Sequence, residues 1–325
     1  MSVSLVTPDD FQALLSVFRS RGWKFLFNKV KLSGSDRVKK QWDTYQTSGS
    51  NWWEVPAIRL RWNMKITGNK QETWEEYVSR KYFRNQSDFR VLSVGCGSGE
   101  KERLFARYAP FIKIEGIDVS RTMVMRATEE ASKAGLKNLT YHVGDFSKFS
   151  FEKENFDMVL FNSSLHHFNR IEELILGNVL PVLKPGGIVL MFEYVGPNRF
   201  QYTNNQLEVV NNCLAALPRN FKVRKDNSVK TRTYRPGWLR MWLNDPSEAP
   251  CAEDILPVLH KHLIVIEEKA VGGSLLHPLL KGIAHNFIDV KNETNQLLDI
   301  LFCDEDKFYE QTGQSDFWFG VYRKK

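Results

Sequence analysis

Short apolar runs alternate with amphipathic stretches through the middle third of this 325-residue chain. Five of these runs, between residues 90 and 196, are rich in β-branched or aromatic side chains and predict strands over residues 91–94, 112–118, 139–145, 156–162 and 187–195. Residues 101–109 and 121–135 instead have helical spacing, and Gly135 is placed to end the second helix. Strands that alternate with helices predict a parallel sheet with helices on both faces.

The pattern differs on either side of this region. Residues 1–85 are rich in aromatic side chains at helical spacing and predict a helical lid or substrate segment. Residues 86–325 should form the sheet domain, with an inserted cap at about 198–250 and a further helical insertion at about 274–312. Two more strands complete a seven-stranded, mostly parallel α/β sheet, over residues 262–271 and 316–324.

Composition narrows the class of protein. Hydrophobic residues make up 42% of the chain and charged residues 26%, which is enough apolar surface for a large core. No run of 18 apolar residues occurs, and Asp9 and Asp10 stand where a signal peptide would need basic residues. We therefore expect a cytoplasmic protein without a membrane partner.

Cysteine spacing and charge add two further expectations. The four cysteines are far apart and form no C-x-x-C pair, so neither a disulfide framework nor a metal site is predicted. The net charge of +7 is modest, although residues 222–240 contain seven basic residues and one acid. That segment could be a solvated basic face or a binding surface for an anionic substrate or partner.

The sequence VLSVGCGSGE, residues 91–100, carries the clearest chemical signal. Gly95, Gly97 and Gly99, with Cys96 among them, lie between a predicted strand and a predicted helix, where bare backbone can approach a ligand. A dinucleotide loop would need glycine at position 100, but Glu100 stands there and would repel a pyrophosphate. No Gly-Lys-Ser/Thr follows, so the Walker pattern fails too. The loop predicts a nucleoside ligand without phosphates.

Acidic residues end the next two predicted strands. Asp118 lies 118 − 99 = 19 residues after Gly99, where a carboxylate can accept hydrogen bonds from both ribose hydroxyls. Asp145 can accept the amino group of adenine, and the Phe146 ring can flank the base. Each residue alone could be a turn, a helix cap or core, but their joint placement at successive strand ends favours a ligand site.

Residues 90–196 resemble the class I S-adenosylmethionine-dependent methyltransferases in the motifs GCGSG, GIDVS, GDF, FDMVLFNSSLHHF and LKPGGIVLMFE, in this order. The resemblance implies a Rossmann-like fold, methyltransferase activity and S-adenosylmethionine as cofactor. It implies these cofactor-binding residues: Gly95, Cys96, Gly97, Gly99, Asp118, Val119, Met123, Asp145, Phe146 and Asn162. Ser93 departs from the family, which commonly has an acid there, so we expect the carbonyl of Gly95 or Asn162 to bind the amino group of the methionine part instead.

Methyl transfer from a sulfonium is an in-line displacement, which needs a positioned acceptor and, for a protonated acceptor, a base. The loop after the fourth strand contains His166 and His167, and either imidazole could be that base, with His166 slightly favoured. Glu193, near the end of the fifth strand, is a second candidate for base or orienting group. The structural alternatives are that the two histidines pack in the core or cap a helix, and that Glu193 forms a salt bridge.

The same loop limits the acceptor. Enzymes of this fold that methylate nucleic-acid bases typically carry Asn/Asp-Pro-Pro-aromatic there, whereas this chain has Asn162-Ser-Ser-Leu. A small-molecule oxygen or nitrogen acceptor is therefore favoured, including anionic or sugar-containing metabolites. Guanidinium groups bind such anions bidentately, and the predicted acceptor contacts are Arg59, Arg61, Trp62, Arg232 and Arg235.

Two alternatives stay open at the level of sequence. An RNA or protein methyltransferase would suit the isoelectric point near 9.1. The second alternative is a subunit that binds the cofactor but does not catalyse methyl transfer. We expect a small-molecule partner rather than nucleic acid, and both a monomer and a homodimer are compatible with the sequence.

Overall fold

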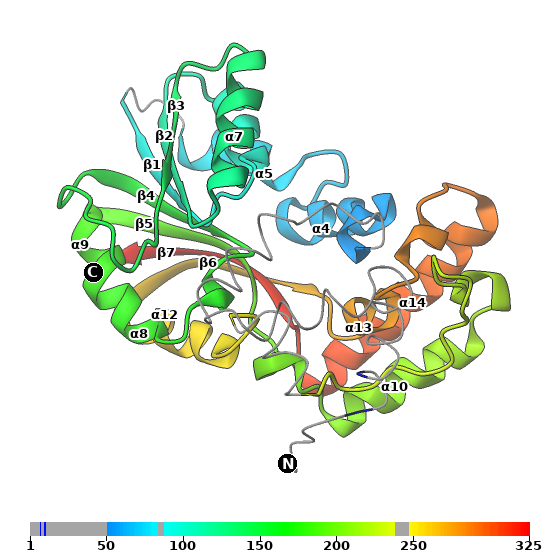
Figure 1. Ribbon diagram of the computed structural model, residues 1–325. Helices are drawn as coiled ribbons and strands as arrows, with labels where there is room; N and C mark the ends of the chain where they lie inside the picture. The colour runs from blue at the N-terminus through cyan, green and yellow to red at the C-terminus, as the bar shows by residue number, and fades with distance from the viewer. Residues whose placement is uncertain (1–6, 8–9, 11–50, 84–87, 238–246) are drawn as a thin grey trace, which may run out of the picture.

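The computed structural model describes residues 7, 10, 51–83, 88–237 and 247–325 (Figure 1). Most of the predicted N-terminal lid, residues 1–85, lies outside these residues. Its described part contains η1 (Trp52–Glu54), α4 (Pro56–Thr67) and α5 (Trp74–Tyr82). Gly68 ends α4 in the left-handed conformation, and Thr73 and Glu76 form a capping box at the start of α5.

A seven-stranded sheet of order β3-β2-β1-β4-β5-β7-β6 forms the centre of the fold. Its strands are β1 (Arg90–Val94), β2 (Lys113–Asp118), β3 (Leu139–Val143), β4 (Phe156–Asn162), β5 (Leu183–Tyr194), β6 (Leu263–Gly272) and β7 (Phe317–Lys324). Strands β1 to β5 pair in parallel, and β7 runs antiparallel to both of its neighbours. The predicted seven-stranded, mostly parallel, Rossmann-like sheet is confirmed.

Strand order determines where the helices lie. The chain moves outward from β1 to β3 and then returns to β4 and β5 on the other side of β1. Because parallel crossovers are right-handed, this reversal sends the two sets of helices to opposite faces of the sheet. Helices α6 (Glu100–Tyr108) and α7 (Arg121–Lys133) follow β1 and β2, whereas α8 (Ile171–Leu174), the π-helical turn η3 (Ile175–Val179) and α9 (Leu180–Val182) precede β5 (Figure 1). A crevice for ligands is expected between β1 and β4, where the order reverses.

The Leu183–Gly187 turn is built into the start of β5. Leu183 pairs with Phe156 of β4 and Ile188 with Met158, so one residue of β4 lies opposite four residues of β5. Gly186 adopts the left-handed conformation with φ of +73°. This turn is therefore an interruption of the β4–β5 ladder and not a loop before the strand.

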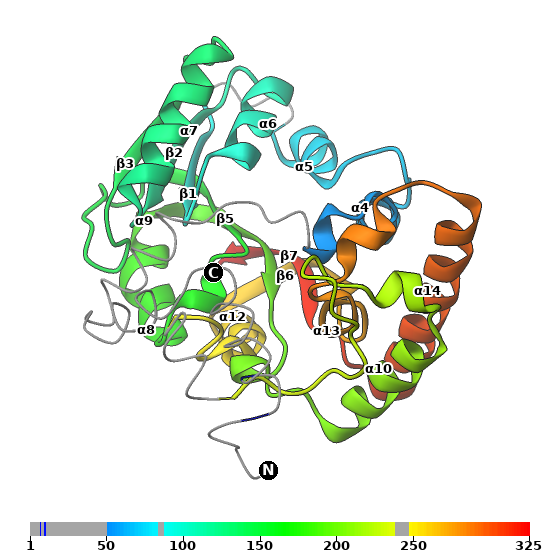
Figure 2. The ribbon, with the colours of Figure 1, turned by 45° about the vertical axis from the view of Figure 1, so that its right-hand side comes forward.

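Further helices follow β5 in the chain. They are α10 (Asn204–Ala216), α12 (Ile255–His262), α13 (Leu276–Leu280) and α14 (Asn292–Thr312), with 3₁₀ turns η4 (Asn198–Phe200), η5 (Arg219–Lys222), η6 (Ala252–Asp254) and η7 (Ala284–Phe287). Figures 1 and 2 show α4 beside α13 and α14, although these segments are far apart in sequence. None of the helices in the described ranges combines the length and the apolar character that a bilayer span requires.

Candidate active site

A cavity of about 1970 Å³ lies at the carboxyl ends of the strands, where the sheet order reverses. Residues that end or follow β1, β2, β3, β4 and β5 all border it. One side is formed by the glycine loop and the loops after β2 and β3. The other side is formed by η1, α4, the end of β5 and residues near 247 and 277.

The three glycines of the loop have positive φ angles, of 69° at Gly95, 52° at Gly97 and 72° at Gly99. A methyl group on Gly95 would lie 2.5 Å from Cβ of Ser164, and one on Gly99 would lie 2.5 Å from the Tyr141 hydroxyl. A methyl group on Gly97 would meet no atom within 4 Å. Gly95 and Gly99 are thus needed for packing, while Gly97, like Gly95 and Cys96, borders the cavity.

Asp118 connects the glycine loop to the segment after β2. Its Oδ2 accepts a hydrogen bond from the Gly97 N–H at 2.9 Å, and its Oδ1 accepts one from the Ser120 N–H at 2.8 Å. Asp118 and Val119 border the cavity, whereas Met123 is buried in α7 and does not. The carboxylate therefore supports the loop in addition to facing the place where a ribose is predicted.

The end of β3 supplies the other predicted nucleoside contacts. Asp145 accepts hydrogen bonds from the N–H and the hydroxyl of Ser147, at 3.0 and 2.7 Å, and Lys148 lies 3.3 Å away. Burial acts to raise the pKa of Asp145, but these polar contacts outweigh it and lower the pKa below its usual value. Asp145 is thus ionised at neutral pH, and the Phe146 ring borders the cavity beside it.

His166 and Glu193 form a buried pair behind the loop after β4. Glu193 is fully buried, and its Oε1 accepts hydrogen bonds from the N–H groups of Ser164 and Leu165 at 2.5 and 2.7 Å. Its Oε2 lies 2.7 Å from Nδ1 of His166. Because an ionised carboxylate only accepts, Nδ1 donates, and the lone pair of the neutral imidazole is then on Nε2. Glu193 is placed to orient His166, and His166 borders the cavity while Glu193 does not.

Glu248 lies on the other side of the His166 ring. Its Oε1 is 3.7 Å from Nε2 of His166, and His167 lies beside Ser247, with Nδ1 3.2 Å from the Ser247 carbonyl oxygen. His166, His167 and Glu248 present ligand atoms within 4.8 Å of one another and could hold a divalent metal. The sequence predicted no metal site, since Glu248 is in an irregular segment far from the two histidines. The Nε2 lone pair can take a proton or a metal, not both.

Aromatic rings form the side of the cavity opposite the glycine loop. The Trp52 and Trp62 rings are 5.0 Å apart, and Trp62 and Phe192 are 4.9 Å apart, measured between ring centroids. Phe317 lies 5.0 Å from Trp52. The Trp52 Nε1–H is buried without a hydrogen-bond partner among the described residues. Sequence analysis missed Trp52 as a site residue because its aromatic segment carried no chemical motif.

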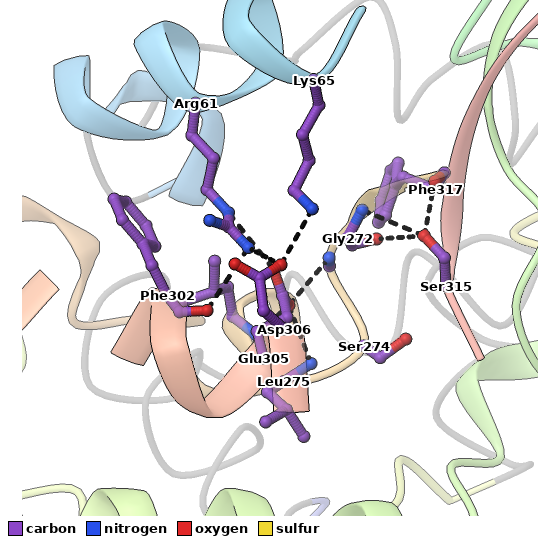
Figure 3. A network of polar contacts seen from close by, with 12 residues as sticks. Arg61, Lys65, Gly272, Ser274, Leu275, Phe302, Glu305, Asp306, Ser315 and Phe317 are labelled. Carbon is purple, nitrogen blue, oxygen red and sulfur yellow. Dashed lines mark hydrogen bonds and ion pairs between the residues drawn. The ribbon is translucent and has the colours of Figure 1, made fainter. Parts of the chain in front are cut away.

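The predicted acceptor contacts divide into two groups. Arg59 and Trp62 border the cavity, and the Nε–H of Arg59 donates to the Trp53 carbonyl. Arg61 does not border it, since its guanidinium points from α4 toward α14 and lies 2.7 Å from Asp306 (Figure 3). Arg232 and Arg235 border a separate cavity of about 590 Å³. Acceptor contacts by these last three residues stay a prediction that their positions do not support.

His277 lies among the aromatic rings and borders the same cavity. Burial lowers its pKa to about 3, helped by positive charge on Lys281, His166 and Lys230. Between pH 6.5 and pH 3 the unfolded chain therefore binds a proton here that the folded protein does not, so stability falls as the pH decreases through this window.

Replacing His277 with Phe should remove this acid sensitivity. As the pH is lowered from 7.5 to 5, the wild type should lose about 2 kcal/mol more unfolding free energy than His277→Phe. This loss accumulates at about 1.4 kcal/mol per pH unit below pH 6.5. Urea denaturation at both pH values measures it. A difference that does not change with pH would show that folding does not lower the pKa of His277.

Known proteins match the part of the chain that contains the glycine loop. Residues 85–240 match the family model of a methyltransferase domain. The sterol 24-C-methyltransferase of Candida albicans is 32% identical over 133 residues, which cover 41% of this chain and 35% of that protein. The sterol methyltransferase-like 2 of Botryococcus braunii is 32% identical over 133 residues, or 40% of this chain and 34% of that protein. The chain thus matches only about a third of the length of these relatives.

A solved structure supports the fold over a larger part of the chain. Phosphoethanolamine N-methyltransferase 2 of Haemonchus contortus, in complex with S-adenosyl-L-methionine, superposes with a TM-score of 0.52 and covers 90% of this chain and 60% of that one. The sequence identity is 18%, so this likeness concerns the fold alone.

Proposed function

We propose that this protein, whose residues 85–240 match the family model of a methyltransferase domain, is a class I S-adenosylmethionine-dependent enzyme that transfers a methyl group from S-adenosylmethionine to an oxygen or nitrogen of a small metabolite. The observation that carries the proposal is the 2.7 Å contact between His166 and the buried Glu193, because His166 borders the same cavity as the glycine loop and the aromatic rings. In this proposal, His166 is the base that removes a proton from the acceptor.

The residues on the cofactor side fit S-adenosylmethionine. The open space beside Gly97 lets backbone N–H groups approach a ligand, Asp118 faces the ribose position, and Asp145 with Phe146 faces the adenine position. When bound, this cofactor supplies an electrophilic methyl group on a sulfonium. The protein's own part is to hold both partners in line and to exclude water.

The acceptor side favours a molecule with an apolar, flat portion. Trp52, Trp62, Phe192 and Phe317 offer ring faces and edges there, and such surfaces bind planar or hydrocarbon groups. His166 would accept the proton of the acceptor hydroxyl or amine at Nε2, while Glu193 holds the ring and stabilises the imidazolium that forms. Arg59 and Lys281 also border the cavity and could bind an anionic group of the acceptor.

Packing accounts for part of the basic segment 222–240. Lys230 is only 3% exposed, and its Nζ donates hydrogen bonds to the carbonyl oxygens of Pro278, Leu279 and Lys281, at the end of α13. Arg235 donates to the Tyr202 carbonyl and to Asn204. These charges stabilise the fold, which removes much of the support for an RNA acceptor.

Calorimetric titration with S-adenosylmethionine and, separately, NAD tests the proposal. We expect micromolar binding of S-adenosylmethionine and no binding of NAD. Asp118→Ala should weaken S-adenosylmethionine binding at least tenfold, because it removes the ribose acceptor and the hydrogen bond to Gly97. Binding of NAD instead, or of neither ligand, would contradict the proposal.

A further inference from the structure

Ser93 and Glu102 form a buried contact under the glycine loop. Ser93 lies in β1, two residues before Gly95, where the family commonly has an acid. Its hydroxyl donates to Oε1 of Glu102 at 2.5 Å. Glu102 lies in the first turn of α6, which begins directly after the loop, and both side chains are only 2% exposed. A carboxylate is thus present next to the position where the sequence lacks one.

The second oxygen of this carboxylate has no hydrogen-bond partner in the described part of the chain. Oε2 of Glu102 is buried and makes no hydrogen bond to any described residue. Burial raises the pKa of Glu102, which the Ser93 hydrogen bond only partly opposes. Leaving a buried polar atom unpaired costs free energy, and an unpaired atom at a functional site calls for a ligand or a water.

The neighbouring cations are bonded elsewhere. Lys101 donates to Oε1 of Glu75 at 2.6 Å, and Arg103 donates to the Ser98 carbonyl oxygen at 2.6 Å. Glu102 borders the main cavity together with Val94, Gly95 and Cys96. Glu102 therefore belongs to the part of the cavity lining beside the glycine loop, from which a cationic group of a ligand could approach its carboxylate.

We propose that Glu102 binds the ammonium group of the methionine part of S-adenosylmethionine, in place of the acid that the family commonly carries at position 93. The inference rests on the proposed function. It replaces the earlier expectation that the carbonyl of Gly95 or Asn162 alone serves this group. Sequence analysis missed Glu102 because it lies 102 − 93 = 9 residues later, on a helix, and only the fold brings it beside Ser93.

The test compares two ligands that differ in the ammonium group. S-adenosylmethionine carries it, whereas 5′-methylthioadenosine shares the adenosine and the sulfur but lacks the amino-acid part. Calorimetry should show that Glu102→Gln raises the Kd of S-adenosylmethionine by about ten- to a hundredfold, as expected for loss of a buried hydrogen bond to a charged group. The Kd of 5′-methylthioadenosine should stay within about twofold of the wild-type value. Unchanged S-adenosylmethionine binding, or an equal loss for both ligands, would overturn the inference.

Two further variants make the result specific. Glu75→Gln is the matched control, because Glu75 is also a buried carboxylate on the cavity wall, at 3% exposed, but is paired with Lys101. It should leave the ratio of the two Kd values unchanged, and a shift as large as that of Glu102→Gln would contradict a specific role. Adding Ser93→Asp to Glu102→Gln should restore S-adenosylmethionine affinity, since it returns an acid to β1. Failure of the wild type to bind S-adenosylmethionine would instead refute the proposed function itself.

Discussion

Replacing His166 with Gln should lower kcat for methyl transfer by about a hundred- to ten-thousandfold, the range expected for loss of a general base. S-adenosylmethionine affinity should stay within about twofold, because His166 lies on the loop after β4 and not in the glycine loop. Transfer of a labelled methyl group to an acceptor found by screening small-molecule fractions measures kcat, and calorimetry measures the affinity. An unchanged kcat would show that the acceptor loses its proton without His166.

Glu193→Gln provides the second arm of this experiment. The amide keeps an oxygen that can accept from Ser164 and Leu165, but its NH₂ group would then face Nδ1 of His166. Nδ1 could no longer donate, so the imidazole would favour the tautomer with its proton on Nε2, which cannot accept one. A loss of kcat comparable to that of His166→Gln therefore identifies Glu193 as the orienting residue. His167→Gln should have the smaller effect, since its Nδ1 faces the Ser247 carbonyl.

The sheet could be predicted because its strands carry their own signal. β4 and β5 are covered on both faces, so their apolar runs are almost continuous and bounded by polar residues. Parallel strands also bring their carboxyl ends to one edge, which makes Gly95, Asp118 and Asn162 neighbours of one cavity without any knowledge of side-chain packing. The positions of the glycine loop and of the acids could be predicted for this reason.

Acceptor contacts could not be predicted in the same way. The sequence shows that an arginine is charged but does not show which carboxylate or carbonyl the fold places opposite it. Arg61 lies against Asp306, more than 240 residues along the chain, and Arg235 lies against Tyr202. Conversely, Glu248 and His277 reach the cavity from segments far along the chain from the ends of β1 to β5. Their roles depend on tertiary contacts that no local pattern encodes.

A buried carboxylate on α14 links the helical extension to the active-site cavity. Oε1 of Glu305 accepts hydrogen bonds from the N–H groups of Gly273, Leu275 and Leu276, at 2.9, 3.1 and 3.1 Å, and its Oε2 lies 3.9 Å from Nε of Arg61 (Figure 3). These N–H groups belong to the turn between β6 and α13 and to the first residue of α13. A methyl group on Gly273 would contact Trp52 at 3.0 Å, so the turn packs directly behind the aromatic wall.

Glu305→Leu should lower the free energy of unfolding by about 3–5 kcal/mol, because it leaves three buried N–H groups without their acceptor and Arg61 with one carboxylate fewer. Asp306→Asn is the matched control on the next residue. Its side chain is 43% exposed, so loss of its pairs with Arg61 and Lys65 should cost less than about 1 kcal/mol. Urea denaturation measures both. Equal losses in the two variants would mean that the surface ion pairs, and not the hydrogen bonds of Glu305 to the turn, hold α14 against the wall of the active site.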